Sequence, residues 1–428
     1  MTHNSAFFIS VEKLDNHIIM LINQIHSEPS KPIIKTRGTG PLISSCLASD
    51  TISPSQQHLA LKQHRFIMAD TRLFQSMKIG RVELRHRVVM APLTRLRAGL
   101  DHAPLSIAKE YYTQRASTPG TLIIAEATMP SETHCGSAYS PGIWTSAQIS
   151  AWKDITDAVH SKDCSIFLQI CAPGRAAADP YPCYSSSAIA IDSSSRTPKE
   201  MSEAEIWACI ADFATAAKNA IAAGFDGVEL HAANGYLIDQ FIQDTCNKRS
   251  DSWGGSVGHR SRFALETTKA VVDAVGSDRV GIRFSPWSTF QSMRMQDPVP
   301  QFSHLVRELK RYELAYLHII ESRVNNWTDV EKVEGVDFML DIWGQQSPVL
   351  VAGGFTLDSA TKAVDEEYCQ YDAAVVFGRY FVSTPDLVFR LRNCLDPNPY
   401  DRSTFYTPMK SEGYIDYPFS EAYLRSQA

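Results

Sequence analysis

Residues 202–236 read SEAEIWACIADFATAAKNAIAAGFDGVELHAANGY. The first part has the pattern of an amphipathic helix: Ser202 and Glu205 form a capping box, and Gly224 supplies a stop signal. We expect one apolar face made of Trp207, Ile210, Phe213, Ala214, Ala217 and Ile221. The run at 227–233 follows, and it is too short and too uniformly apolar for a half-exposed strand. The pattern therefore predicts a helix that leads into a parallel strand buried on both faces.

The same unit recurs along the chain from residue 68. Further short apolar runs, separated by turns and helical patterns, lie at 88–93, 121–128, 165–171, 280–286, 316–323, 348–355 and 373–381. Eight buried strands alternating with helices predict an α/β fold, a single (β/α)8 TIM barrel. An open doubly wound sheet is the main alternative, and the number of strands favours closure.

The first 67 residues lack this pattern and contain Ser/Thr/Pro-rich stretches such as 51–57. We expect residues 1–67 to be a poorly ordered N-terminal extension, and residues 68–428 to form the barrel with a C-terminal tail. Met68 is a second candidate start, in which case the extension is an artefact of the gene model. Peptides from residues 1–67 in a mass spectrum of the native protein would refute that hypothesis.

Composition excludes several classes of protein. The chain has 428 residues, 44% of them hydrophobic, and a net charge of −6. Such a chain is not disordered, and its mild acidity provides no general attraction to nucleic acid or anionic lipid. No run reaches the ~18 apolar residues of a membrane span. Nine scattered cysteines without a CxxC pair indicate a reducing, cytoplasmic location, and no residue set has metal-ligand spacing, so we expect no metal.

Glycines follow the last two strands, where barrels of this type often bind phosphate. Gly353 and Gly354 end the seventh strand, and Gly378 and Arg379 end the eighth. Two ordinary turns and a surface arginine are the alternative. The paired occurrence in this order favours phosphate binding.

Three polar residues follow the fourth strand, and their types suit acid–base chemistry. His231 and Asn234 offer two hydrogen-bond donors that can hold an oxygen as it gains negative charge. Tyr236 is a phenol, protonated at neutral pH, and can act as a general acid. A structural histidine is the ordinary alternative.

Arg283 lies within the apolar run VGIRFSP (280–286), so it needs an anionic or strongly polar partner. A salt bridge to Glu126 or Glu321 is a serious alternative to a ligand. The stretch at 247–263 is rich in charge and glycine, and we interpret it as a structural loop capping the barrel. It contains no GxGxxG motif, and no separate dinucleotide-binding domain is indicated.

The chain resembles the old yellow enzyme family of flavin-dependent ene-reductases, particularly its fungal members, over residues 69 to about 425. The motifs that carry the resemblance are RVVMAPLTRLRA (87–98), HAANGYLIDQF (231–241), NKRSDSWGGSVGHRSRF (247–263), TFQSMRMQDPVPQF (289–302), VAGGF (351–355), FGRYFVSTPDLV (377–388), YDRSTFYTP (400–408) and GYIDYP (413–418).

The resemblance implies non-covalent FMN in the barrel mouth, reduced by NADPH. The implied FMN contacts are Pro92, Leu93, Thr94, Ala127, Gln169, Arg283, Gly353, Gly354, Gly378 and Arg379. His231 and Asn234 would grip the carbonyl oxygen of an α,β-unsaturated aldehyde or ketone. The flavin N5 would then deliver hydride to the β-carbon, and Tyr236 would protonate the α-carbon. Tyr406 would cap the pocket.

One departure from the family concerns the substrate. Cys171 stands where the family usually has tryptophan, which would remove a wall of the pocket and admit a bulkier substrate. We expect the loop at 173–201 to form a lid.

The resemblance leaves alternatives open. One is a flavin-dependent reductase or isomerase of a secondary-metabolite pathway, such as that acting on chanoclavine-I aldehyde in ergot alkaloid biosynthesis; Tyr236 favours reduction. Others are a non-catalytic flavin-binding relative and a flavin-free, colourless phosphate-binding lyase or isomerase. We expect a monomer or homodimer with a small-molecule substrate.

Overall fold

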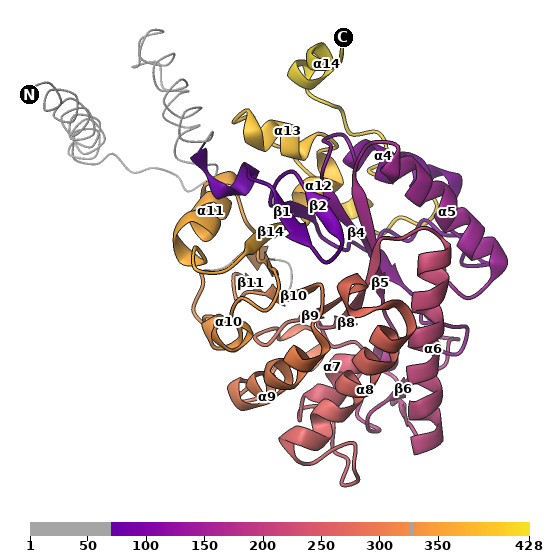
Figure 1. Ribbon diagram of the computed structural model, residues 1–428. Coiled ribbons are helices and arrows are strands. Elements are labelled where there is room, and N and C mark those ends of the chain that lie inside the picture. Colours follow the sequence, from indigo (N-terminus) through magenta and orange to yellow (C-terminus); the bar gives the residue numbers. More distant parts are fainter. Residues whose placement is uncertain (1–69, 326–327, 330) are drawn as a thin grey trace, which may run out of the picture. The chain divides into compact units, whose positions relative to one another are not determined.

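The computed structural model describes residues 70–325, 328–329 and 331–428 (Figure 1). Eight parallel strands close into one barrel, which confirms the expected fold and excludes the open sheet. In barrel order they are β3 (Val88–Met90), β4 (Leu122–Thr128), β5 (Ser165–Ile170), β8 (Gly227–Ala232), β9 (Val280–Phe284), β10 (Tyr316–Ile320), β13 (Val349–Ala352) and β14 (Ala373–Phe377). The expectation for residues 1–67 lies outside the described residues.

Helices surround the strands, as the alternating pattern predicted (Figure 1). They are α4 (Ser106–Arg115), α5 (Ser146–His160), α6 (Glu203–Ala222), α7 (Leu237–Ile242), α8 (Val257–Val275), α9 (Val299–Leu309), α10 (Asp337–Trp343), α11 (Leu357–Lys362), α12 (Arg379–Ser383), α13 (Leu387–Arg392) and α14 (Glu421–Gln427). Two small sheets lie in the loops: β6 (Tyr184–Ser185) with β7 (Lys199–Glu200), and β11 (Val324–Asn325) with β12 (Thr328–Asp329).

Helix α6 begins where its capping box predicted. The Ser202 hydroxyl accepts from the backbone N–H of Glu205, whose carboxylate accepts from the N–H of Ser202. Trp207 was wrongly assigned to the buried face, because it is 40% exposed and its ring lies beside Trp253. The face that packs inward is made of Ile206, Cys209, Ile210, Phe213, Ala216, Ala217 and Ala220.

A hairpin before the barrel, β1 (Met77–Ile79) and β2 (Val82–Leu84), was not predicted from the sequence. Its apolar side chains belong to one buried cluster with residues of the barrel interior, including Val89, Phe167 and Leu350. The hairpin therefore closes the end of the barrel at which the strands begin.

Polar side chains occupy one half of the barrel interior. Gln169, Glu229, Arg283 and His318 come from the four neighbouring strands β5, β8, β9 and β10. The parallel register places Gln169 opposite Glu229, and Arg283 opposite both His231 and His318. Closure of the barrel thus brings together charged and polar groups that are far apart in the sequence.

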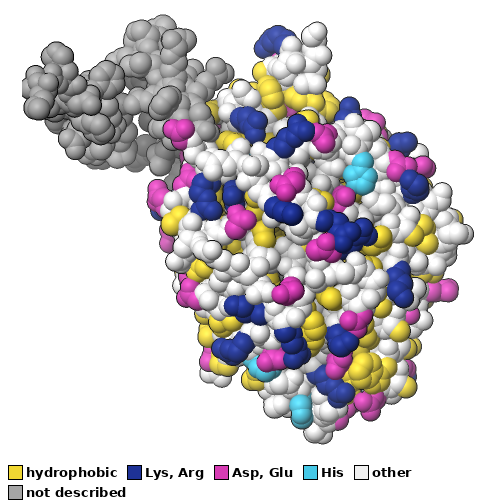
Figure 2. Space-filling model, in the orientation of Figure 1, with side chains coloured by type: hydrophobic (Ala, Val, Ile, Leu, Met, Phe, Trp, Pro, Cys, Tyr) yellow, Lys and Arg dark blue, Asp and Glu magenta, His cyan; other side chains and the backbone are white. Residues whose placement is uncertain are grey.

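The molecular surface drawn in Figure 2 carries Lys and Arg interspersed with Asp and Glu. No helix in the described part of the chain is long and apolar enough to cross a membrane.

Candidate active site

A cavity of about 470 Å³ opens at the carboxyl ends of the strands. This volume is typical of sites for small molecules and cofactors. Its wall contains every predicted site residue except Cys171: Pro92, Leu93, Thr94, Ala127, Gln169, His231, Asn234, Tyr236, Arg283, Gly353, Gly354, Gly378, Arg379 and Tyr406. The structure therefore brings nearly all of the expected residues to one place.

A tight turn between β8 and α7 positions the three candidate catalytic residues. Asn234 and Gly235 adopt left-handed backbone conformations, with φ of 56° and 75°. Asparagine tolerates this region better than most residues. The N–H of Asn234 donates to the hydroxyl of Ser285 at 2.8 Å, and the N–H of Gly235 donates to Asp239 at 2.9 Å. The turn sends the side chains of His231, Asn234 and Tyr236 into the same cavity.

His231 is held as a neutral hydrogen-bond donor. Burial, together with the positive charge of Arg283, lowers its pKa well below the ordinary value. The Nδ1 atom accepts the backbone N–H of Ala233 at 3.4 Å, so the ring proton resides on Nε2. A neutral imidazole with Nε2–H can donate to an oxygen in the cavity without contributing a full charge.

Tyr236 remains protonated at neutral pH. Burial raises its pKa, and the neighbouring Cys171 and Tyr406 raise it further. Its ring centroid lies 4.8 Å from that of His231. A phenolic proton therefore stands next to the imidazole that would hold the substrate oxygen.

Arg283 has no carboxylate ion-pair partner among the described residues. Glu126 instead accepts from the backbone of Arg95, and Glu321 pairs with Arg323 at 2.7 Å. The Nε of Arg283 is buried and has no hydrogen-bond partner in the described part of the chain. The alternative of a salt bridge to Glu126 or Glu321 is therefore wrong, and the guanidinium faces the cavity, where a ligand could neutralise it.

The two glycine turns line the opposite part of the cavity. A Cβ atom built on Gly353 would lie 3.2 Å from the Cβ of Glu321, so a larger residue would require a shift of a few tenths of an ångström. Gly354 has a φ of 67°, which strongly favours glycine. Arg379 follows Gly378 and donates to the hydroxyl of Tyr400. This part of the cavity can accept an anionic group close to the backbone.

Aromatic residues that the sequence reasoning missed complete the cavity: Phe290, Phe355, Phe377, Tyr380 and Phe405. Phe290 and Phe405 lie within the motifs TFQSM and TFY, so their positions in those motifs were the available signal. Arg97 fixes the segment that carries Phe405, because its guanidinium donates to the carbonyl of Phe405 and the hydroxyl of Thr407.

Cys171 does not line the cavity. Its side chain is 1% exposed, and it lies close enough to Tyr236 to affect that residue's pKa. The expectation that Cys171 opens a wall of the pocket is therefore not supported by its place in the structure. A larger residue at this position would act on the cavity by displacing Tyr236.

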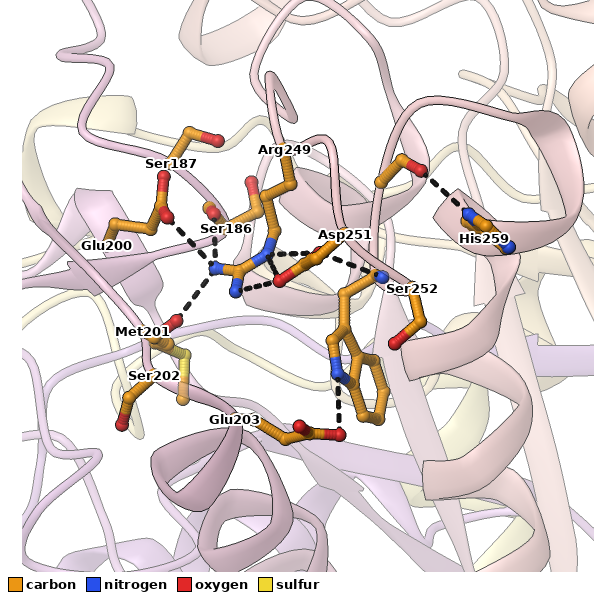
Figure 3. A network of polar contacts seen from close by, with 12 residues as sticks. Ser186, Ser187, Glu200, Met201, Ser202, Glu203, Arg249, Asp251, Ser252 and His259 are labelled. Carbon is orange, nitrogen blue, oxygen red and sulfur yellow. Dashed lines mark hydrogen bonds and ion pairs between the residues drawn. The ribbon is translucent and has the colours of Figure 1, made fainter.

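The loop at 173–201 contributes no residue to the wall of the cavity, and its expected role as a lid stays a prediction. Hydrogen bonds connect this loop to the stretch at 247–263, as Figure 3 shows. Arg249 donates to the carbonyls of Ser186 and Met201, at 3.0 and 2.7 Å, and pairs with Asp251 at 2.6 Å. The structural interpretation of residues 247–263 is consistent with these contacts.

Comparisons with known proteins agree with this geometry. The sequence pattern of the NADH:flavin oxidoreductase / NADH oxidase family matches residues 72–398. A chanoclavine-I aldehyde reductase of Penicillium roqueforti (strain FM164) is 54% identical, covering 83% of this chain and 98% of the relative. A protein described as a probable inactive reductase of Epichloe festucae var. lolii is 46% identical, covering 83% and 97%. The crystal structure of old yellow enzyme from Pichia sp. AKU4542 aligns with a TM-score of 0.77 and 37% identity, covering 83% and 95%.

The chain therefore belongs to the NADH:flavin oxidoreductase / NADH oxidase family. More narrowly, it is an old yellow enzyme-like FMN oxidoreductase for which NAD(P)H is the reductant.

The residues of the cavity fit FMN. Arg283 offers a buried, unpartnered donor, and a bound flavin ring presents the oxygen and nitrogen acceptors that could satisfy it. The glycine turns after β13 and β14 line the cavity, and glycine has no side chain that would keep a phosphate from the backbone. Pro92, Leu93 and Thr94 supply a wall between these two regions, along which the flavin would lie.

Proposed function

We propose that the protein is an ene-reductase that reduces the C=C bond of α,β-unsaturated aldehydes or ketones, with NADPH as the electron donor. The observation that carries this proposal is the convergence of His231, Asn234 and Tyr236 in the cavity that also contains Gln169 and Arg283. Two donors and one acid, placed beside a flavin site, are the groups that this reaction requires.

The carbonyl oxygen of the substrate is bound by Nε2–H of His231 and the side-chain amide of Asn234. These donors stabilise negative charge on the oxygen and so polarise the conjugated C=C bond. Because His231 is neutral, it stabilises the charge by hydrogen bonding and retains its proton.

Tyr236 holds a proton at its phenolic oxygen and donates it to the α-carbon. The raised pKa keeps this proton in place at neutral pH. FMN, when bound, would supply the two-electron chemistry that connects NADPH with the β-carbon. Phe290, Phe405 and Tyr406 surround the space left for the substrate and favour an apolar molecule.

A second candidate is an enzyme of secondary metabolism that acts on chanoclavine-I aldehyde. The chanoclavine-I aldehyde reductase that is 54% identical to this chain favours this second candidate. A second relative, 46% identical, is described as a probable inactive reductase, so sequence identity alone does not decide whether the chain is active. Tyr236 can protonate carbon, and its presence favours a net reduction over an isomerisation.

The experiment is a product analysis in D2O with the holoenzyme and a Tyr236→Phe variant. The wild type should place one solvent deuterium on the α-carbon. The phenylalanine variant should still be reduced by NADPH but should lose at least ~100-fold in substrate reduction. Unchanged substrate reduction in Tyr236→Phe would refute the role assigned to Tyr236.

We further propose a cytoplasmic location and a monomer or homodimer. The scattered cysteines of the sequence support the location. Cell fractionation and light scattering on the purified protein would test these two statements.

A further inference from the structure

Glu229 is a buried carboxylate in the barrel interior that the proposed reaction does not use. It lies on β8, two residues before His231, and its side chain has no solvent exposure. Burial of an ionised carboxylate is costly unless several donors compensate it. Such a group beneath a cofactor site therefore requires an explanation.

Three side chains donate hydrogen bonds to this carboxylate. The amide Nε2 of Gln169 lies 2.8 Å from Oε1, the hydroxyl of Tyr316 lies 3.1 Å from Oε2, and Nδ1 of His318 lies 2.7 Å from Oε2. The three donors come from β5 and β10, on the two sides of the Glu229 strand in the barrel. Together they satisfy a carboxylate that has no access to water.

Gly281 makes this arrangement possible. A Cβ atom on Gly281 would lie 2.2 Å from the ring of Tyr316, a distance that no side chain can adopt. The tyrosine ring therefore lies across the glycine, and its hydroxyl reaches Glu229. A strand residue with any side chain would prevent that hydrogen bond.

The charges of the group can be assigned from its contacts. His318 is fully buried, its Nε2 has no hydrogen-bond partner among the residues that the structure describes, and burial lowers its pKa. It is therefore a neutral ring that donates from Nδ1. Burial disfavours the ionised form of Glu229, whereas the hydrogen bonds donated by Gln169, Tyr316 and neutral His318, and the positive charge of Arg283, favour it. Glu229 is therefore an anion, and Arg283 is the nearby cation that it offsets.

Glu229 also determines the orientation of Gln169. Because Nε2 donates to Glu229, the carbonyl oxygen of the same amide is left to accept a hydrogen bond from a ligand in the cavity. Gln169 and Arg283 both line the cavity, whereas Glu229 lies behind them. The carboxylate thus acts on a ligand through two residues that can touch it.

We propose that Glu229 is a positioning residue that lowers the reduction potential of bound FMN, by offsetting the charge of Arg283 and by orienting Gln169. The inference rests on the proposed function, because it places the flavin against Gln169 and Arg283. Reduced FMN carries more negative charge than oxidised FMN, and an anion nearby disfavours the reduced form. Removal of the Glu229 charge leaves Arg283 uncompensated and so favours the reduced form.

The test compares the FMN midpoint potential of the wild-type holoenzyme with that of Glu229→Gln. In Glu229→Gln, the affinity for reduced FMN divided by the affinity for oxidised FMN should rise at least tenfold. This rise is equivalent to a midpoint potential about 30 mV higher for a two-electron couple. Tyr316→Phe is the matched control, because it removes one hydrogen bond to Glu229 and no charge. It should change the ratio by less than threefold.

The same comparison can be made in Arg283→Met, a variant that lacks the buried positive charge of the guanidinium. The double variant Glu229→Gln/Arg283→Met should have a higher potential than Arg283→Met alone, because an unopposed anion has been removed. This comparison applies if the single Glu229→Gln variant does not fold.

Each outcome decides the proposal. Unchanged potentials in both backgrounds, or equal shifts in Glu229→Gln and Tyr316→Phe, would overturn it. Folded variants that bind no FMN in either background would also overturn it, because the role of Glu229 would then be to form the site. A wild-type protein that cannot bind FMN would instead refute the proposed function, so the two failures are distinguishable.

Discussion

Ser285→Ala tests how the barrel positions the candidate catalytic residues. The hydroxyl of Ser285, 1% exposed, accepts the backbone N–H of Asn234 at 2.8 Å. Asn234 has a left-handed backbone, which most residues adopt only at a cost. We expect the Ser285 hydrogen bond to hold that conformation, and with it the direction of the Asn234 side chain.

The expected size of the effect of Ser285→Ala follows from the loss of the hydroxyl that accepts the N–H of Asn234. A buried N–H left without a partner costs about 1–3 kcal/mol. If the cost is borne by the catalytic arrangement, kcat/KM for substrate reduction should fall by about 5- to 150-fold. If it is borne by the whole fold, the free energy of unfolding should fall by the same amount and activity should be retained.

The assay measures both quantities, with Ser261→Ala as the matched control. Ser261 is also fully buried, and its hydroxyl accepts from Gln301 at 2.7 Å, but neither of its hydrogen-bond partners, Gln301 and Val257, lines the cavity. Stopped-flow kinetics should show slower substrate reduction in Ser285→Ala and not in Ser261→Ala. Equal kinetics in both variants, with equal loss of stability, would refute the positioning role of Ser285.

Three further predictions concern other parts of the barrel. Burial raises the pKa of Glu126 to about 7, above its ordinary value, so the folded state loses about 3 kcal/mol of stability as the pH rises from 4.5 to 7. Glu126→Gln removes this loss. The melting temperature of the variant minus that of the wild type should therefore increase as the pH rises from 5 to 8, and a difference that does not change with pH would contradict the assignment. Cys171→Trp should crowd Tyr236 and reduce turnover of bulky enals more than of small ones, with a stability cost of ~1–3 kcal/mol; an unchanged substrate profile would count against it. Gly353→Ala would place a Cβ 3.2 Å from that of Glu321, and FMN titration of the apoprotein should show binding about tenfold weaker, or ~1.4 kcal/mol.

The barrel strands, and the polar residues at their carboxyl ends, were predictable because short stretches of sequence mark each of them. A parallel strand covered on both faces is almost uniformly apolar, so Arg283 in VGIRFSP was conspicuous. The capping box at Ser202 fixed the start of α6 for the same reason. The same argument could have found Glu229 in GVELHAA, because a carboxylate inside a buried strand also requires partners.

The remaining features depend on contacts between distant segments. Cys171 follows a strand that was correctly predicted, but its distance from the cavity depends on how Tyr236 packs against it. The hairpin at 77–84 consists of strands too short to show a period. The wall formed by Phe405 depends on the attachment of the tail to Arg97, more than 300 residues earlier in the chain. No local pattern encodes these pairings.

The most direct test of the central claim is the absorption spectrum of the purified protein, followed without oxygen as NADPH and then an enal are added. We expect a yellow protein whose flavin absorbance bleaches with NADPH and returns with the enal. Bleaching without recovery would contradict the assignment of His231, Asn234 and Tyr236 to substrate reduction. A colourless protein that cannot be reconstituted with FMN would contradict the account as a whole.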